Sequence, residues 1–355
     1  MLDINGLLAR MEALNAADLF LKPPCKPTYK ISGRATPMEE HPPLTPEDVE
    51  AILPVILRPK DQEKFRERNQ VDCSYVLPDG SRFRNNTYRQ RGTAAMVFRR
   101  INTKVPTTED LHLPEILKEV SMQQNGLILI TGATGSGKST TLAALIDYRN
   151  EHSRGHIVTL EDPIEFVHPD KGCVVSQREV GVDVESFEDG LKAALRQAPN
   201  VILMGEIRDA EGCEAALHLC ETGHLVFGTL HSTNANQSIE RVMQMFPHER
   251  APEIYALLSG NLRCIMSQRL IRNMEGRYTM VAEILLATPR VQELLKRGED
   301  GELKAVMQAS TRDGMQTFDQ SIYNVFKNGD IDEETALRYA DSPNDMKLRM
   351  RGFTN

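Results

Sequence analysis

The sequence predicts an α/β protein in which a smaller, strand-containing domain precedes a larger domain built on a parallel sheet with helices on both faces. Three observations predict this. From residue 127 onward, apolar runs typical of buried strands alternate with helical patterns. A glycine-rich loop joins the first of these strands to a helix that begins near Lys138. Residues 71–101 instead predict consecutive strands, the first two joined by a tight turn at Asp79-Gly80.

The composition is that of a globular protein with enough material for about two domains. The chain has 355 residues, of which 40% are hydrophobic and 26% charged. Its net charge of −8 argues against a dedicated nucleic-acid binder. The six cysteines form no C-x-x-C pair, which indicates a reducing compartment and no zinc site. Because the N-terminus lacks a signal-peptide pattern and no apolar run is long enough to span a membrane, we expect a cytoplasmic protein.

The N-terminal domain is expected over residues 1–101. Apolar residues recur at helical spacing at its start, whereas the proline-rich stretch that follows leaves room for short strands only. Thr45 is an N-cap followed by a proline and two acids, which predicts the start of a helix. The predicted elements are a helix over 2–16, a strand over 28–31, a helix from Thr45, a helix over 60–68, and strands over 71–77, 81–88 and 95–101.

Six arginines and no acid lie between residues 82 and 100, on and between two of these strands. They are Arg82, Arg84, Arg89, Arg91, Arg99 and Arg100. Three interpretations fit: a solvated strand face, a nucleic-acid contact, or arginines that reach the nucleotide of a neighbouring subunit. Strands are stiff platforms that aim guanidinium groups at phosphate, which keeps the third interpretation physically reasonable.

Residues 102–114 are polar, contain two prolines and lack a clear period, which predicts a linker between the domains. The second domain is then expected over residues 115–355. Its predicted elements are strands over 127–131, 156–162, 201–207 and 224–230, helices over 138–150, 209–221 and 236–246, a hairpin around 268–271 and 278–284, and mainly helices after residue 247.

The stretch GATGSGKST is a phosphate-binding loop of the pattern G-x-x-x-x-G-K-S, placed between a strand and a helix. Its glycines let backbone N–H groups approach phosphate oxygens, and the following helix directs its positive end at the same anion. Lys138 is expected to reach the β- and γ-phosphates, and the Ser139 hydroxyl to hold Mg²⁺. A glycine turn that merely caps a strand is the alternative, which the full spacing and flanks disfavour. The predicted ATP-binding residues are Gly132, Ala133, Thr134, Gly135, Ser136, Gly137, Lys138, Ser139 and Thr140.

Acidic residues lie at or just after the ends of two of the predicted strands in the second domain. Glu161, Asp162 and Glu165 come after one strand, and the carboxyl ends of such strands are where α/β sheets bind ligands. Separately these residues fit a helix cap and surface charges; beside a phosphate loop, a catalytic role is favoured. Glu206 ends another apolar strand, and glycine occupies the place where an aspartate usually precedes such a glutamate. Contact between Glu206 and Mg²⁺ is therefore expected to run through water.

Two histidines, His224 and His231, stand at the ends of the next apolar strand. Each histidine alone is more often a hydrogen-bonded structural residue than a functional one. Their position at the two ends of one strand beside the predicted site favours sensing of phosphate or orientation of a carboxylate.

Four stretches in this order resemble the secretion-ATPase superfamily: Walker A, the Asp box TLEDPIEF, an atypical Walker B strand VILMGEIRD and the His box GHLVFGTLHSTNANQ. The resemblance runs the full length of the chain and includes the arginine-rich strands FRNNTYRQRG and VFRRI. Within the superfamily the chain is similar to type IV pilus retraction ATPases, because it is short and lacks the tetracysteine element of extension and type II secretion motors. This resemblance implies a RecA-like P-loop ATPase domain, a smaller PAS-like α+β N-terminal domain, and a homohexameric ring with ATP between the domains.

By position, the resemblance assigns roles to residues of the second domain. Lys138 and Ser139 match the Walker A lysine and Mg²⁺ ligand. Glu165 matches the glutamate taken as the general base for the attacking water, and Glu206 matches the Walker B glutamate near Mg²⁺.

The same comparison by position covers the remaining motifs. His224 and His231 match the His box. Arg84 and Arg99 match arginines that reach the phosphates, and an arginine finger is worth roughly 10³ to 10⁵ in rate in other enzymes.

The C-terminal tail resembles that of the PilU group, and the A-I-R-x-L-I-R helix motif typical of the PilT group is absent. The resemblance therefore implies a motor using ATP and Mg²⁺ that assists a PilT-type retraction ATPase. The resemblance further implies that this motor acts on the inner-membrane pilus platform protein at the cytoplasmic face of that membrane, with only indirect membrane contact and no nucleic-acid partner. Three alternatives stay open: an autonomous PilT-type motor, a nucleic-acid translocase with the same core, and a non-hydrolysing ATP-binding ring that serves as a structural adaptor.

Overall fold

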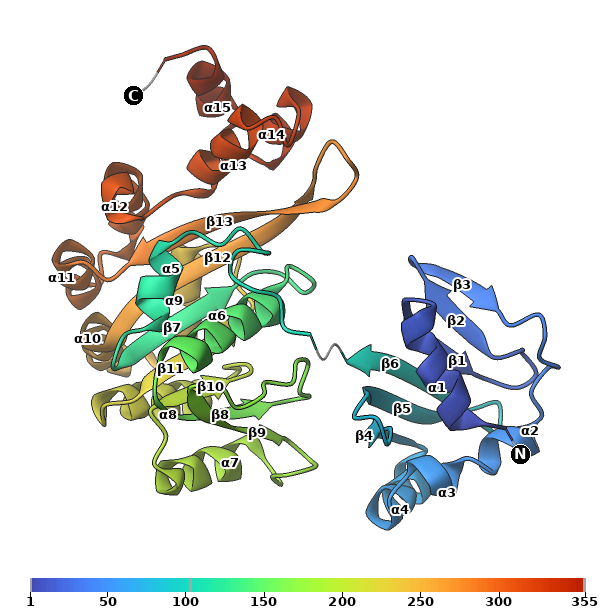
Figure 1. Ribbon diagram of the computed structural model, residues 1–355. Coiled ribbons are helices and arrows are strands. Elements are labelled where there is room, and N and C mark those ends of the chain that lie inside the picture. Colours follow the sequence, from blue (N-terminus) through green and yellow to red (C-terminus); the bar gives the residue numbers. More distant parts are fainter. Residues whose placement is uncertain (1, 102–103, 354–355) are drawn as a thin grey trace. The chain divides into compact units, whose positions relative to one another are not determined.

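The structure is a computed structural model that describes residues 2–101 and 104–353. It divides into two compact units (Figure 1). The first unit comprises Met1–Lys104 together with Pro163–Val167. The second comprises Val105–Asp162 and His168–Asn355.

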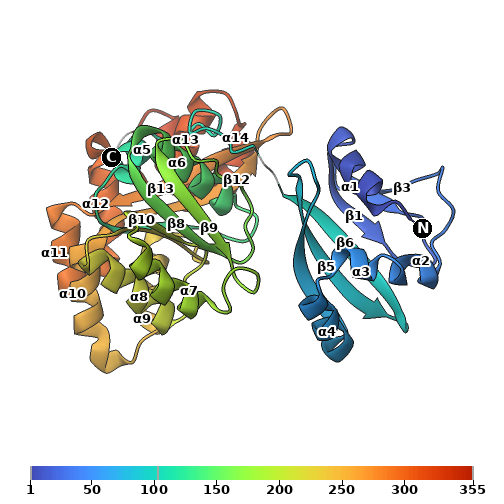
Figure 2. The same cartoon turned by 60° about the horizontal axis from the view of Figure 1, so that its bottom comes forward.

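The first unit is an antiparallel sheet whose helices pack on one face (Figure 2). Its elements are α1 (Ile4–Ala13), β1 (Ala16–Leu21), β2 (Thr28–Ile31), β3 (Arg34–Pro37), α2 (Pro46–Glu50), α3 (Leu53–Ile56), α4 (Pro59–Arg68), β4 (Gln70–Val76), β5 (Arg82–Gln90) and β6 (Thr93–Ile101). The strand order is β3-β2-β1-β6-β5-β4. Buried side chains of all four helices join the inward residues of the sheet in one hydrophobic core.

Local signals explain where the helices of this unit begin and end. A capping box starts α2, because the Thr45 hydroxyl accepts from the Asp48 N–H while the Asp48 carboxylate accepts from the Thr45 N–H. α4 ends at Asn69, whose φ of 58° is the left-handed conformation typical of a helix C-terminus. The predicted helices and strands of this region are confirmed within a few residues.

The sequence prediction missed β1. Asp18 and Leu19 are adjacent and both buried, so the strand lacks the alternation of apolar and polar residues that marks a half-buried strand. A buried aspartate is compatible with a strand here because cations surround it: the Asp18 carboxylate contacts Arg99 at 2.8 Å and Lys30 at 3.4 Å.

The second unit holds a mixed sheet with helices on both faces. Its elements are α5 (Ile116–Ser121), β7 (Gly126–Thr131), α6 (Lys138–His152), β8 (Gly155–Glu161), β9 (Cys173–Glu179), α7 (Phe187–Ala194), η1 (Leu195–Gln197), β10 (Val201–Met204), α8 (Ala210–Glu221), β11 (Leu225–Leu230), α9 (Ala235–Gln244), η2 (His248–Arg250), α10 (Ala251–Asn261), β12 (Leu262–Arg272), β13 (Tyr278–Leu286), α11 (Pro289–Arg297), η3 (Asp300–Glu302), α12 (Leu303–Ala309), η4 (Thr311–Asp313), α13 (Phe318–Lys327), α14 (Glu333–Tyr339) and α15 (Pro343–Met350).

The strand order of this sheet is β13-β12-β7-β11-β10-β8-β9. Neighbouring strands are parallel except β13, which runs antiparallel to β12 at one edge. Leu127 and Leu129 of β7 belong to a core with α8, α9 and α10, whereas Ile128 and Ile130 belong to a core with α5 and α6 on the opposite face. This confirms the predicted α/β class with helices on both faces. β9 and α7 were not predicted. For β9 the reason is that its residues, most of them half-buried, form no clear apolar run.

The C-terminal helices pack on the end of the β12–β13 hairpin (Figure 1). Ile271 and Val281 of the hairpin share a buried cluster with Phe318 and Ile322 of α13. The Arg269 guanidinium lies 3.7 Å from the centre of the Phe318 ring and donates to the Asp341 carboxylate at 3.0 Å. These contacts attach α13–α15 to the sheet.

The predicted linker begins at residues 102 and 103, which lie outside the described residues. Its later part is counted with the second unit. Thr107 and Asp110 exchange two hydrogen bonds between backbone N–H groups and side chains, and Leu113 is buried in the core beside α6. Residues 105–114 are therefore packed against the second unit.

Within residues 2–101 and 104–353, no helix has both the length and the apolar character that crossing a membrane requires.

Candidate nucleotide-binding and hydrolysis site

The phosphate-binding loop follows β7, a strand whose residues are all buried. Gly132, the first loop residue, has a φ of +150°, and a Cβ there would lie 2.5 Å from the Ser136 hydroxyl and 2.6 Å from the Gln268 carbonyl oxygen. Gly137 has a φ of +89° and would place a Cβ 3.1 Å from the Gln268 side-chain nitrogen. Both positions therefore require glycine, because the loop bends sharply against a neighbouring strand.

The loop residues fit a bound phosphate chain. The Lys138 Nζ donates to the carbonyl oxygens of Gly132 at 2.8 Å and Ala133 at 3.1 Å, so the ammonium group lies along the inside of the loop. The Ser136 hydroxyl is buried and has no hydrogen-bond partner among the described residues. Gly137, at the N-cap of α6, provides no side-chain cap for the first turn of that helix. The N-terminus of a helix, an ammonium and an unpaired hydroxyl together suit an anion.

Strand β12 supports the loop from beside it, a contribution that the sequence prediction missed. Gln268 is buried and its Nε2 donates to the Ser136 carbonyl oxygen at 2.6 Å. Its neighbour Ser267 lies 2.7 Å from the hydroxyl of Thr131, the residue before Gly132. No local signal identifies these residues, because their role comes from the pairing of β12 with β7.

Glu206 follows β10, and each of its carboxylate oxygens has a side-chain partner. The Arg208 Nε donates to one oxygen at 2.8 Å, and the His231 Nε2 lies 3.3 Å from the other. Arg208 also lies 3.6 Å from the Asp162 carboxylate, and its hydrogen bond to Glu206 raises the pKa of its guanidinium. Arg208 was not predicted as a site residue, although it stands two residues after Glu206 in the same motif.

Strand register explains why these residues meet. β7, β11, β10 and β8 are parallel neighbours, and the loop, His231, Glu206 and Asp162 all follow their carboxyl ends. The Thr229 hydroxyl donates to the Gly205 carbonyl at 2.6 Å and so ties the end of β11 to the Glu206 segment. The edge of the sheet that the sequence predicted is thus the edge at which the candidate site forms.

His224 lies at the other edge. It precedes β11, its carbonyl accepts from Gly126 at the start of β7, and its Nδ1 lies 3.0 Å from the Leu219 carbonyl and 3.1 Å from the Thr222 hydroxyl. The length of β11, about 20 Å at about 3.3 Å per residue, separates it from His231. Within one chain the structure does not bring His224 to the phosphate-binding loop, because the two ends of a strand face opposite edges.

The three carboxylates at and after the end of β8 differ in their surroundings. Glu161 accepts hydrogen bonds from Thr159 at 2.6 Å and Gln177 at 3.1 Å, so its side chain is bonded to residues of β8 and β9. Asp162 faces Arg208. Glu165 is exposed and is counted with the first unit. The structure therefore joins Asp162 to the Glu206 cluster and leaves the predicted role of Glu165 a prediction.

Arg84 and Arg99 are paired with each other in the first unit. They stand directly opposite in the β5–β6 ladder, and both are exposed. The Arg99 Nε donates to the buried Asp18 carboxylate at 2.8 Å, which raises the pKa of Arg99, and Arg84 lies 3.7 Å from Asp72. Asp18 thus holds the Nε of Arg99, whereas a terminal nitrogen of Arg84 only lies near the Asp72 carboxylate.

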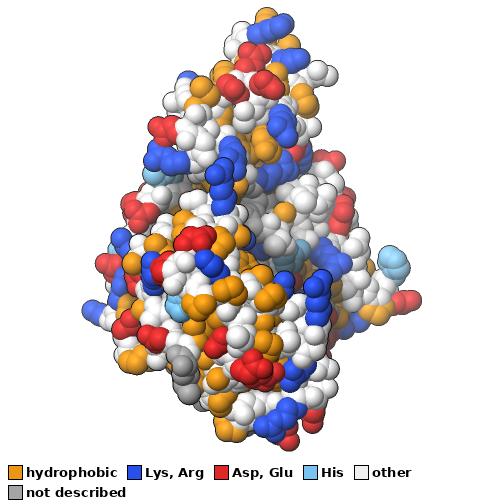
Figure 3. Space-filling view, turned by 90° about the vertical axis from the view of Figure 1, so that its right-hand side faces the viewer, with side chains coloured by type: hydrophobic (Ala, Val, Ile, Leu, Met, Phe, Trp, Pro, Cys, Tyr) orange, Lys and Arg blue, Asp and Glu red, His pale blue; other side chains and the backbone are white. Residues whose placement is uncertain are grey.

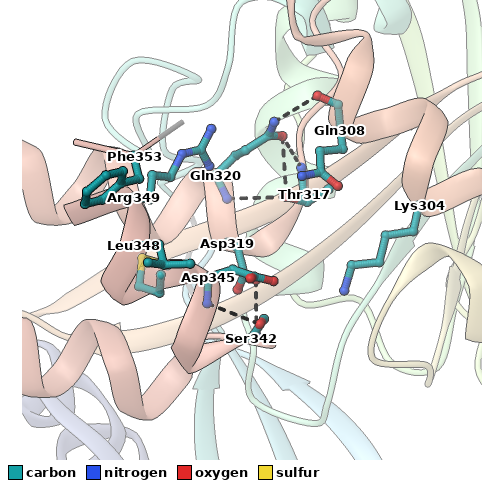
Figure 4. Close-up of a pocket in the computed structure, with 11 residues that line it drawn as sticks. Lys304, Gln308, Thr317, Asp319, Gln320, Ser342, Asp345, Leu348, Arg349 and Phe353 are labelled. Carbon is teal, nitrogen blue, oxygen red and sulfur yellow. Dashed lines mark hydrogen bonds between the residues drawn. The ribbon is translucent and has the colours of Figure 1, made fainter. Parts of the chain in front are cut away.

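A pocket among the C-terminal helices contains none of the predicted site residues (Figure 4). Its polar groups already have partners: Asp319 accepts from the N–H groups of Asp341 and Ser342, and Gln320 donates to the Gln308 carbonyl. These bonds connect α12, α13 and α15, so the pocket is part of the packing of the C-terminal helices.

Comparison with known proteins agrees with this geometry. The model of the type II/IV secretion system protein family matches residues 95–278. The chain is 43% identical to the type IV pilus ATPase PilU of Pseudomonas aeruginosa, over 99% of this chain and 92% of that protein. It is 41% identical to the retraction ATPase PilT of the same organism, over 96% of this chain and 99% of that protein. A crystal structure of the pilus retraction motor PilT with bound ADP superposes with a TM-score of 0.92, at 38% identity and with 98% of this chain and 99% of that chain covered.

These matches confirm the resemblance predicted from the four motifs, and the ADP-bound relative supports nucleotide binding. The chain belongs to the type II/IV secretion system protein family, in the group of type IV pilus retraction ATPases that includes PilU and PilT.

Proposed function

We propose that this chain is an ATP hydrolase that assists type IV pilus retraction as a PilU-type accessory to a PilT-type motor. The observation that carries the proposal is the phosphate-binding loop beside the Glu206–His231 pair at one edge of the sheet. The full-length identity to PilU supports the accessory role. In this proposal the chain acts at the cytoplasmic face of the inner membrane on the pilus platform protein.

The proposed site holds ATP with Mg²⁺. The metal ion would neutralise charge on the β- and γ-phosphates when bound. Ser139 is its proposed protein ligand, and Glu206 its proposed contact through water. Lys138 binds the phosphates, since its ammonium already lies inside the loop. Glu165 takes the proton of the attacking water, and His231 orients the Glu206 carboxylate.

We further propose that the chain forms a homohexamer in which Arg84 and Arg99 reach the nucleotide of a neighbouring subunit. The pairing of the two arginines across β5 and β6 supports this role. Because the Asp18 carboxylate holds the Nε of Arg99, the terminal N–H groups of that side chain, which is 65% exposed, are available to a phosphate. The face shown in Figure 3 mixes basic and acidic side chains, whereas a nucleic-acid-binding face is expected to be mainly basic.

A second candidate is an autonomous PilT-type motor. The TM-score of 0.92 to PilT and the 41% identity favour it, because both values cover nearly the whole chain. A non-hydrolysing adaptor ring is the third candidate, and measured turnover separates it from the other two.

The test of hydrolysis is phosphate release by the purified full-length chain with ATP and Mg²⁺. Lys138→Ala and Glu165→Gln are expected to abolish turnover, and Arg34→Ala, an exposed arginine of β3, to leave it unchanged. Near-normal turnover of the first two variants would contradict the assigned roles.

The test of the arginine role is subunit mixing. Arg84→Ala should impair hydrolysis without unfolding the chain. Mixing Arg84→Ala subunits with Lys138→Ala subunits should restore part of the activity, because some interfaces then combine an intact arginine with an intact loop. If activity does not recover at any mixing ratio, Arg84 and the phosphate-binding loop with Lys138 act within the same subunit, which would contradict the proposal.

A further inference from the structure

A buried carboxylate on β13 lies next to the start of α9. Glu283 of β13 stands opposite Ser267 of β12 and is 2% exposed. Its Oε1 accepts a hydrogen bond at 2.8 Å from the backbone N–H of Ala235, the first residue of α9. Burial raises the pKa of Glu283, and the Ala235 N–H partly offsets that rise. A carboxylate is costly to bury, so its position at this helix start calls for a structural explanation.

A set of buried hydroxyls lies beside the same helix start. The Ser238 hydroxyl lies 2.7 Å from the Ser232 hydroxyl, 2.7 Å from the Asn234 carbonyl and 3.4 Å from the Thr131 hydroxyl. Thr131 in turn pairs with Ser267 at 2.7 Å. Two short hydroxyl pairs, joined by one longer contact, thus connect the segment after β11 to the residue that precedes the phosphate-binding loop.

The segment after β11 is therefore fixed at two points. Ser238 holds Ser232, and Glu283 holds Ala235. His231 precedes the first of these points, and its half-exposed ring reaches Glu206 at 3.3 Å. Since Ser232 is adjacent to His231 in the chain, a shift of the fixed segment moves the imidazole relative to the Glu206 carboxylate.

We propose that Glu283 and Ser238 are positioning residues for hydrolysis, which hold the segment 231–235 so that His231 meets Glu206 beside the phosphate-binding loop. The inference rests on the proposed role of His231 at the hydrolysis site. Neither residue touches the nucleotide site directly; both act through the backbone that carries His231.

The first test is steady-state kinetics of the full-length chain. Glu283→Met keeps the length of the side chain and removes the acceptor, whereas Glu283→Gln keeps an acceptor oxygen for the Ala235 N–H. We expect Glu283→Met and Ser238→Ala to lower kcat roughly fivefold each, with KM for ATP changed less than about twofold, and Glu283→Gln to retain activity. Ser121→Ala, a buried serine whose hydroxyl donates to the Lys118 carbonyl, is the matched control.

The second test separates positioning from general stability. In a His231→Ala background, Ser238→Ala and Glu283→Met should lower kcat no further, because their effect passes through His231. An equal additional loss in that background would overturn the inference. Ser238→Ala keeps the test valid if Glu283→Met fails to fold.

A third measurement does not depend on turnover. Amide hydrogen exchange of the segment 231–238 should be roughly fivefold faster in Glu283→Met and Ser238→Ala than in the unchanged chain and in Ser121→Ala. Unchanged exchange in both variants would overturn the inference even if the proposed function holds. A chain that shows no ATP turnover but the expected exchange would contradict the proposed function and leave the anchoring of the segment established.

Discussion

Of the three loop glycines, Gly132 has the least space for a Cβ. A Cβ at this position would meet the backbone oxygen of Gln268 in β12, which cannot move without disturbing the sheet, and the φ of +150° adds strain. Strain of about 1–3 kcal/mol corresponds to roughly 5- to 150-fold in affinity. We expect Gly132→Ala to weaken nucleotide binding by an amount in that range, measured by titration with a fluorescent ATP analogue.

The control for Gly132→Ala is Gly223→Ala. Gly223 also has a positive φ, +96°, but no atom lies within 4 Å of the position of its Cβ. It therefore tests backbone strain alone, away from the site. Equal nucleotide affinity of Gly132→Ala and Gly223→Ala would contradict the contact between the loop and β12.

Glu283 provides a prediction about pH. Its pKa is raised by burial, so the folded chain binds a proton that the unfolded chain releases, and the stability of the fold rises as pH falls from neutral toward the ordinary glutamate range. Glu283→Gln removes this cost and keeps the acceptor for Ala235. We expect its free energy of unfolding at pH 7 to equal or exceed that of the unchanged chain, and the difference to shift in favour of the unchanged chain as pH falls.

The measurement for this prediction is denaturant unfolding of both chains from pH 7 to pH 5. The neighbouring charges of Arg269, Lys304 and Asp341 are the same in both, so the difference isolates Glu283. A Gln variant that is less stable at pH 7, with no change across the range, would show that the carboxylate charge itself stabilises the fold.

Among single residues, those that belong to a recognisable motif were predicted from the sequence. Those that reach the candidate site only through the fold were missed. Lys138 and Glu206 stand in recognisable patterns directly after apolar strands. Gln268 and Ser238 are single polar residues in segments remote in sequence from the loop, and only strand pairing and helix packing place them there. His224 was grouped with His231 because the sequence shows both ends of a strand without showing that they face opposite edges.

Among the elements, one arginine adds to the hydrophobic attachment of the C-terminal helices α13–α15. Arg269 stacks on Phe318 and donates to Asp341. These side chains are only partly exposed, so the cation–π and charged hydrogen-bond contacts together are worth about 1–3 kcal/mol. We expect Arg269→Leu to lower the free energy of unfolding by that amount, measured with urea.

Arg277→Leu is the matched control for this change. Arg277 lies in the turn of the same hairpin and pairs with Glu275, but its side chain is 76% exposed, and exposed ion pairs contribute little. Similar losses in the two variants would contradict the attachment of α13–α15 through Arg269.

The strongly patterned elements were predicted and the weakly patterned ones were not. β7 is apolar throughout and α8 has a clear period with an aspartate N-cap, so both were found within a few residues. β1 contains a buried aspartate and β9 is half-buried along its length, so their sequences lack the alternation that marks a strand. Their places are set by the neighbouring strands that pair with them.

For the whole molecule, the proposed function assigns different parts of one reaction to the two units. The second unit holds the phosphate-binding loop and the Glu206–His231 pair. The first unit holds Arg84 and Arg99, which stand opposite each other on β5 and β6. In the proposed hexamer the arginines of one subunit complete the site of another, so hydrolysis depends on assembly. We expect the turnover per subunit to fall on dilution below the concentration at which the ring dissociates, measured by phosphate release alongside light scattering.

The most direct test of the accessory role is pilus retraction in cells, measured by micropillar or optical-trap force, with this chain as the sole retraction-type ATPase and again together with a PilT-type ATPase. We expect no retraction from this chain alone, and an increase in retraction force when it joins the PilT-type motor. Lys138→Ala should abolish that increase, since it removes ATP hydrolysis in this chain. Retraction powered by this chain alone would contradict the accessory role and make it an autonomous motor, and an unchanged force in both backgrounds would contradict the proposed function.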